Sequence, residues 1–312
     1  MPGYNLTSIV IFCAAVLAAL LIDLFSHKKD KPVSMVNSAL WSVFWVVLSF
    51  VFAFYIGWIH GMEKAYLFIS GYLLEKSLSV DNLFVFMAIF SSFAIKDQFQ
   101  HRILYFGIIG ALIMRFLFIA VGTSLLLLGQ WVLAVFGAFV LWSAWKMYQA
   151  KSAGHTEIQD YTNHWSVKLA RKIFSVHPYV EGNVFFLRQG GKLFVTPLFL
   201  CVIAVEAADI MFAFDSVPAV IAITQEPFLI YTSNIFAILG LRSMYFLLAA
   251  AKKYLCHLEM SVIVILAFIG VKMLLAVTGL WHIPVNASLI FMLLCLTGGI
   301  IASIAFPKQT AI

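Results

Sequence analysis

The sequence predicts an all-α membrane protein with about nine transmembrane helices, and two observations carry this prediction. The 312-residue chain is 63% hydrophobic and only 11% charged, whereas soluble domains are roughly 45–50% apolar and about 25% charged. Its apolar residues also gather in runs of about 20, the length a helix needs to cross the hydrocarbon core. We therefore expect one transmembrane domain over residues 1–312. Its partner is the lipid bilayer, and we expect no nucleic-acid partner despite the net charge of +6.

Nine apolar runs follow one another along the chain. They cover residues 7–25, 40–59, 65–93, 103–128, 131–149, 194–223, 231–251, 260–279 and 285–306. The one long connection, residues 150–193, is polar and basic, and we expect a loop there with a short amphipathic helix near 165–174. The first residues carry no basic segment, so we expect no cleaved signal peptide.

Lysine and arginine distribute unevenly between the two sets of connections. With the N-terminus outside, fourteen of them lie on the cytoplasmic side, and only Lys64 lies on the outer side. Basic residues concentrate in cytoplasmic loops of membrane proteins. The sequence therefore predicts an outer N-terminus, with the 150–193 loop and the C-terminus in the cytoplasm.

The third and sixth predicted spans carry five carboxylates, although a charge near the membrane centre costs about 2.5–3.5 kcal/mol. Each span has one pair of acids six residues apart, and a small polar residue follows the second acid of each pair. We predict that the two segments are halves of one cation site. Its residues are Glu75, Asp81, Asn82, Glu206, Asp209, Asp215 and Ser216.

Further matches suggest that the spans are related in two groups of three. Spans 3–5 and 6–8 each carry an acid motif, then a Gly motif (106–111 and 236–241), then a Lys-Met pair (146–147 and 272–273). The two groups run in opposite directions, which predicts a 3+3 inverted repeat with repeat 1 over 65–149 and repeat 2 over 194–279. Secondary transporters are often built this way, with broken helices at the site. Pro218 and the polar residues beside Asp81 predict such breaks here.

The available ligands restrict the ion. Carboxylates, an amide and a hydroxyl are hard oxygen donors, and they suit Mn²⁺, Mg²⁺ or Ca²⁺ better than Zn²⁺ or Cu⁺. All eight histidines fall in loops or near span ends, and the four cysteines lie far apart. The alternative is that the acids only pair with cations inside the spans. Those cations, which are also gating candidates, are Lys76, Arg115, Lys146, Arg242 and Lys272.

Residues 75–82, 206–218 and 234–246 together closely resemble the TerC family of integral membrane proteins, nearest to its Alx-like branch. The resemblance covers about residues 40–306. The family takes its name from tellurium resistance, and Alx-like members are linked to manganese export across the bacterial cytoplasmic membrane. The resemblance implies that the five acids of the two motifs form the metal site.

From residues and resemblance together we expect a secondary transporter that exports Mn²⁺, with protons as counter-ion, because clustered carboxylates exchange protons readily. Ca²⁺, Mg²⁺ or tellurium-related transport is one alternative. Another is a non-transporting membrane protein that assembles partners through residues 150–193. We expect no enzyme and no cofactor, because the chain carries no hydrolase, nucleotide or cofactor motif.

Overall fold

The computed structural model describes residues 6–26, 35–129, 131–152, 161–177, 184–189, 191–251, 258–279 and 283–305. The side chains of Asp81 and Asp215 lie outside the described part. The helices are α1 Leu6–Ser26, α2 Met35–His60, α3 Met62–Ser92, α4 Asp97–Leu125, α5 Trp131–Ser152, α6 Trp165–Ile173, α7 Pro197–Ile223, α8 Pro227–Ile238, α9 Leu241–Ala251, α10 Leu258–Thr278 and α11 Val285–Ala305. Two strands, β1 Phe186–Gln189 and β2 Lys192–Val195, complete the fold.

The predicted all-α, multi-pass membrane architecture is confirmed. Within the described residues, α2, α4, α5, α7, α10 and α11 are long and apolar enough to span a membrane, and the bent pair α8–α9 makes a seventh span. α1 and α3 fall outside this set, and α3 carries five charged residues. Length and composition thus support six or seven spans, and nine crossings stay a prediction that counts α1 and α3.

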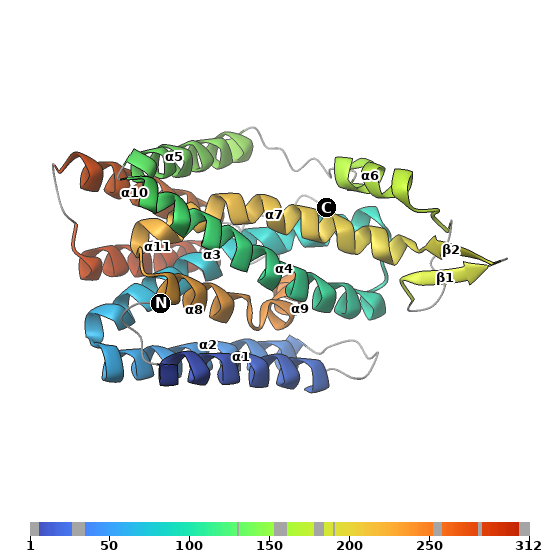
Figure 1. The fold of residues 1–312 in the computed structure, drawn as a ribbon, viewed down its shortest axis with the longest axis horizontal. Helices are drawn as coiled ribbons and strands as arrows, with labels where there is room; N and C mark the ends of the chain where they lie inside the picture. The colour runs from blue at the N-terminus through green and yellow to red at the C-terminus, as the bar shows by residue number, and fades with distance from the viewer. Residues whose placement is uncertain are drawn as a thin grey trace.

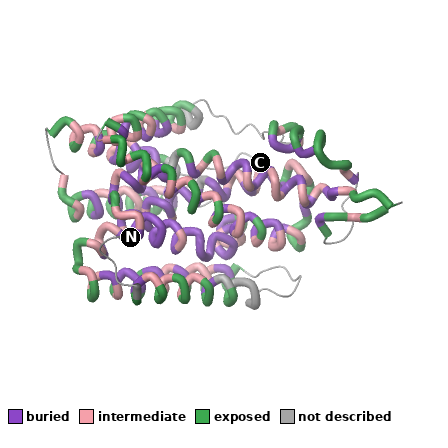
Figure 2. Tube along the Cα trace, viewed as in Figure 1, coloured by how far each residue is buried: buried purple, intermediate pink, exposed green. Residues whose placement is uncertain are grey.

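The long helices lie side by side in one bundle (Figure 1). In this view α1 and α2 form the lowest layer, α5 lies at the top, and α3, α4, α7 and α8 run between them. Buried residues concentrate on these central helices, whereas the outer helices present exposed residues (Figure 2). The exposed residues include many large apolar side chains, such as Val36 on α2 and Ile304 on α11. An apolar outer surface around a polar centre is what a bilayer requires of a helix bundle.

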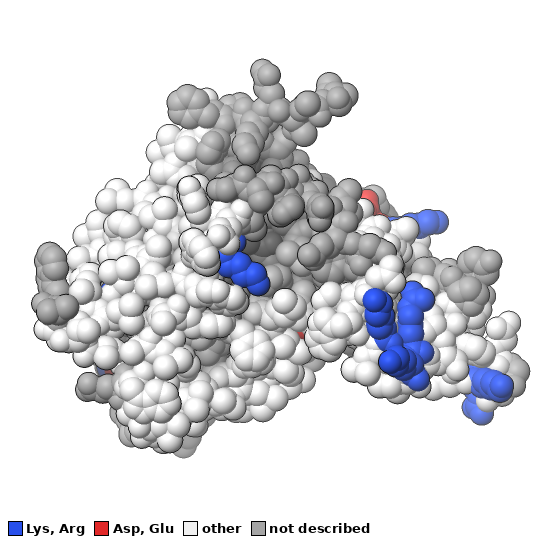
Figure 3. Space-filling model, turned by 90° about the horizontal axis from the view of Figure 1, so that it is seen from above, with Lys and Arg blue, Asp and Glu red and all other residues white. Residues whose placement is uncertain are grey.

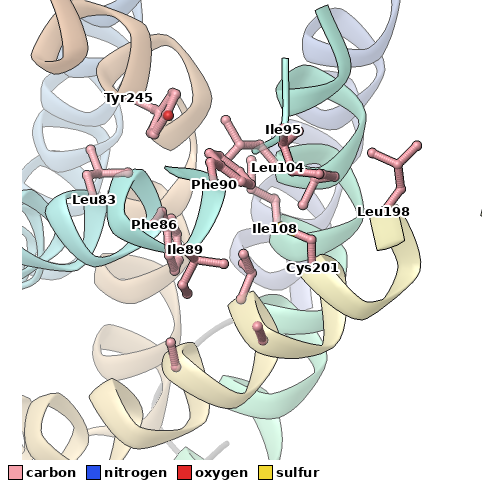
Figure 4. Packing of buried hydrophobic residues seen from close by; sticks show 14 of the residues in the cluster. Leu83, Phe86, Ile89, Phe90, Ile95, Leu104, Ile108, Leu198, Cys201 and Tyr245 are labelled. Carbon is pink, nitrogen blue, oxygen red and sulfur yellow. The ribbon is translucent and has the colours of Figure 1, made fainter. Parts of the chain in front are cut away.

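A cluster of apolar side chains joins α3, α4, α7 and α9 (Figure 4). Phe90 of α3 meets the ring of Tyr245 of α9 edge-on at 5.4 Å. The Tyr245 hydroxyl donates to Gln100 Oε1 at 3.0 Å, and Gln100 Nε2 donates to the Ile95 carbonyl at 3.1 Å. These bonds satisfy the buried polar atoms and fix α9 against the turn between α3 and α4.

The long connection forms a small unit that projects from one end of the bundle (Figure 1). The predicted amphipathic helix is present as α6, with Val167 and Ala170 buried and Lys168 exposed. The hairpin of β1 and β2 is a feature that sequence analysis missed; it pairs Phe186 with Val195 and Gln189 with Lys192. Basic side chains gather on this projecting end (Figure 3), where α6 and the hairpin carry Lys168, Arg171, Lys172, Arg188 and Lys192.

The expected breaks in the acid-bearing helices are wrong. α3 and α7 are continuous, and α7 passes through Pro218. Neighbouring helices and the bilayer hold such a helix together even though the proline removes one backbone bond. The break lies instead between α8 and α9, which bend by 42° at Leu239 and Gly240. Gly240 has φ of +77°, a left-handed conformation that favours glycine.

Candidate functional site

A buried arginine links two of the predicted acids at the centre of the bundle. Arg115 of α4 donates from Nη1 to Glu75 Oε2 of α3 at 2.5 Å, and from Nη2 to Asp209 Oδ1 of α7 at 3.5 Å. Glu75 is 0% exposed, Arg115 1% and Asp209 4%. Side chains from the consecutive helices α3 and α4 and from the distant helix α7 therefore meet at one ion-paired cluster, which we call the Arg115 cluster.

Asn234 of α8 closes this cluster. Its Nδ2 donates to Glu75 Oε1 at 2.7 Å, and its Oδ1 accepts from Arg115 Nη1 at 3.1 Å. Both oxygens of Glu75 thus hold a hydrogen bond. Because a buried carboxylate is stable only when paired and hydrogen-bonded, Asn234 and Arg115 together account for the burial of Glu75.

Glu206 lies one turn of α7 before Asp209, on the same side of that helix. Its carboxyl group rests against the backbone of Gly110 of α4, where a Cβ atom would lie 2.1 Å from Glu206 Oε1. Only glycine leaves this space. Glu206 Oε1 is buried and has no hydrogen-bond partner among the described residues.

Asp209 also keeps one oxygen open. Its Oδ2 is buried without a partner in the described part of the chain. Asp209 lines a void of about 10 Å³, together with Phe86, Ile108 and Val205. That volume is close to what one water molecule needs. Two acids on one face of α7 therefore carry open acceptor oxygens beside the Arg115 cluster.

The remaining predicted site residues are placed only in part. Asn82 and Ser216 are buried, and Ser216 Oγ has no partner among the described residues. The side chains of Asp81 and Asp215 lie outside the described residues. Among the residues that are described, no group of three or more His, Cys, Asp or Glu side chains is arranged to hold a metal ion. Two of the described acids, Glu75 and Asp209, instead pair with an arginine.

The five cations proposed as ion-pair or gating residues have different surroundings. Lys76 donates to two backbone carbonyls of the α8–α9 break. Lys272 donates to Ser288 Oγ at 2.9 Å. Lys146 is exposed, with Nζ 5.1 Å from the ring centre of Trp142, and Arg242 is buried, 4% exposed. Arg115 directly contacts two of the predicted acids, Glu75 and Asp209.

Sequence analysis left Asn234 and Gly110 out of the site. Asn234 could have been noticed in the sequence, because it is the one amide side chain in α8, whose other residues are apolar or carry a hydroxyl. Gly110 had a weaker one, as a glycine inside the α4 span. Neither residue type titrates, so a search for charges passes over both.

A larger cavity of about 740 Å³ lies near the turn between α7 and α8. Its lining includes Glu63, Thr224, Glu226, Lys272 and Asn286. Glu226 forms an ion pair of 3.2 Å with Lys64. This mixed-charge cavity is near the start of α3, several turns from the Arg115 cluster along that helix.

Comparisons with known proteins agree on one family. The model of the integral membrane protein TerC family matches residues 60–311. The chain is 46% identical to "Tellurium resistance protein TerC" of Serratia marcescens, over 98% of this chain and 96% of that protein. It is 41% identical to "Putative membrane-bound redox modulator Alx" of Salmonella typhi, over 89% of this chain and 88% of that protein. No solved structure matches the chain.

Proposed function

Because the chain belongs to the TerC family of integral membrane proteins, we propose that it exports Mn²⁺ from the bacterial cytoplasm in exchange for protons. The observation that carries this proposal is the Arg115 cluster together with two open carboxylate oxygens, one on Asp209 of the cluster and one on Glu206, one helical turn before it. Buried carboxylates inside a membrane domain are costly and mark ion pathways. The oxygen donors favour a hard divalent cation.

In this proposal Arg115 is the resident counter-charge of the empty site. Its guanidinium pairs with both Glu75 and Asp209 when no metal is bound, and its single charge offsets one of the two negative charges. A divalent ion that enters from the side of Glu206 competes with the arginine for Asp209, and Asp81 and Asp215 complete its coordination. Glu75 and Asp209 hold equivalent positions in the two proposed repeats, which supports one shared site between them.

The proposal fixes an orientation, in which the 150–193 loop and the C-terminus are cytoplasmic and the 740 Å³ cavity opens outward. We expect single cysteines at positions 130 and 226 of a cysteine-free variant to react with an impermeant maleimide in intact cells. A cysteine at position 160 is expected to react only after the cells are opened. Labelling of position 160 from outside would contradict both the orientation and the inverted repeat.

The direct test is metal flux. In proteoliposomes that contain the purified chain, a proton gradient is expected to drive Mn²⁺ across the membrane in the direction opposite to the protons. Zn²⁺ and Cu²⁺ are expected to be transported only weakly. In a host without its own manganese exporters, expression is expected to protect against excess Mn²⁺ and not against excess Zn²⁺. Protection against zinc alone would overturn the proposal. Flux of Ca²⁺ or Mg²⁺ in place of Mn²⁺ would leave the assignment of the site unchanged and identify a different transported ion.

A substitution at Gly110 tests the role of Glu206. In Gly110→Ala the new Cβ takes the space of the Glu206 carboxyl group, which has to move. We expect Mn²⁺ flux per folded molecule to fall several-fold, while the thermal midpoint changes little because the displaced group is a flexible side-chain end. Gly298→Ala is the control, since a Cβ at that position meets nothing within 4 Å. Equal flux in the two variants would remove Glu206 from the pathway.

A second candidate function has its own observation. On α6, Trp165, Leu169 and Ile173 are exposed at helical spacing beside basic side chains. Such a face is typical of contact surfaces, and it supports the alternative of a non-transporting membrane protein that assembles partners. Proteoliposomes without any metal flux, together with partner-dependent protection in cells, would favour this alternative.

A further inference from the structure

The break between α8 and α9 leaves backbone carbonyls without helical partners. α8 ends at Ile238, Leu239 is extended with φ −56° and ψ 131°, and α9 begins at Leu241. The last carbonyls of any helix lack an intrahelical donor, and they carry a partial negative charge. Packing also holds the break rigid, because a Cβ at Gly240 would lie 2.3 Å from Trp45 Cδ1.

A lysine from another helix donates hydrogen bonds to these carbonyls. Lys76 of α3 donates from Nζ to the Ala237 carbonyl at 3.2 Å and to the Leu239 carbonyl at 3.4 Å. Lys76 follows Glu75 in the sequence, and one residue turns a helix by about 100°. On α3 the carboxylate of Glu75 therefore points to the Arg115 cluster, and the ammonium group of Lys76 points to the break.

The ammonium group also has space beside it. Lys76 lines a cavity of about 390 Å³ between α2, α3, α9 and α11, whose other walls include Ser42, Val46, Met244 and Ile300. Ser42 Oγ is buried and has no hydrogen-bond partner among the described residues. None of the described residues that line this cavity is Asp or Glu. The neutral oxygens in contact with the ammonium group are thus the two carbonyls of the break, and the cavity beside it is mostly apolar, with the Ser42 hydroxyl in its wall.

We propose that the α8–α9 break is a site for a monovalent inorganic cation, which this chain fills with the ammonium group of its own Lys76. Carbonyl oxygens at unwound helix ends coordinate Na⁺ in transporters with broken helices, and rings of carbonyl oxygens replace the hydration shell of K⁺ in channels. An ammonium group carries the same single charge. The protein therefore needs no sodium or potassium at this position, whichever ion it transports.

The test removes the ammonium group and offers an inorganic cation in its place. The full chain with Lys76→Ala is purified, and its thermal unfolding is measured in NaCl, in KCl and in N-methyl-D-glucamine chloride of equal ionic strength. We expect Lys76→Ala to be less stable than the wild type in the organic salt. Na⁺ or K⁺ is expected to raise its midpoint by a few degrees in a saturable manner, while the wild type gives the same midpoint in all three salts.

Two further variants keep the test decisive. Lys272→Ala also removes an in-span lysine, but one that bonds the Ser288 hydroxyl and, among the described residues, no carbonyl at a helix end. It is therefore expected to show no cation response. Lys76→Ser supplies a hydroxyl oxygen beside the carbonyls and carries the same measurement if Lys76→Ala is not recovered folded. Equal midpoints in the three salts for the Lys76 variants would overturn the proposal, and so would an equal response in Lys272→Ala.

Discussion

Replacing Arg115 by Met is expected to lower the free energy of unfolding by about 3–5 kcal/mol, the cost of breaking a buried ion pair by removing one partner. The reason is that Glu75 and Asp209 both bond Arg115 and are almost fully buried. Met fills a similar volume, so the loss reports the charge and not a cavity. The measurements are the thermal midpoint in detergent and the abundance in membranes, which falls when the folded state is marginal.

Two companion variants sharpen this result. Lys146→Met removes an in-span cation that is exposed over Trp142, and we expect its stability to stay within about 0.5 kcal/mol of wild type. Arg115→Lys keeps the charge but loses the planar fork that reaches both acids, so an intermediate loss is expected. Wild-type stability in Arg115→Met would contradict the ion-paired cluster.

Helix positions and the acid cluster were accessible from the sequence for a simple reason. In a membrane, a run of apolar residues has few alternatives to a helix, so α2, α4, α5, α7, α10 and α11 coincide closely with predicted runs. The same reasoning singles out carboxylates in such runs, because their insertion cost has to be offset. Two of them, Glu75 and Asp209, do converge in space.

Local sequence patterns did not predict the features of the fold that depend on tertiary packing. Pro218 predicted a break, but α7 continues through it between its neighbouring helices. Gly240 lies at the observed break, but its presence in the sequence did not predict one. Glycine is frequent in membrane helices, where it also serves close packing. The β1–β2 hairpin was missed because four-residue strands in a basic loop give too short an alternation to detect.

The ion-pair partner of each charged residue could also not be predicted from the sequence. Five cations and five acids allow many pairings, and only the packing of α3, α4, α7 and α8 brings Arg115 between Glu75 and Asp209. The role of Asn234 follows from the same packing, since it bonds both members of the ion pair. Charge spacing along one helix carries no information about a residue on another.

The second large effect is expected at Asp81 and Asp215, the acids that follow Glu75 and Asp209 by six residues. Asp→Asn at either position keeps the size of the side chain and removes its charge. If both share one divalent ion, either change alone nearly abolishes Mn²⁺ flux, because a lone carboxylate does not balance a double charge in a low-dielectric site. The double variant is then little worse than either single one, as for residues that act as a unit.

Flux has to be measured per folded molecule in proteoliposomes, with abundance followed separately, because a purely structural acid behaves differently. Loss of a structural acid leaves a buried cation unpaired, at a cost of about 3–5 kcal/mol, and appears as low abundance with normal flux per molecule. Asp97→Asn is the control, since Asp97 lies in the first turn of α4 and bonds Gln100 Nε2 at 3.1 Å, far along that helix from Arg115. Normal flux per molecule in Asp81→Asn and Asp215→Asn would refute the shared metal site, and the Arg115 cluster would then serve only to hold the four helices together.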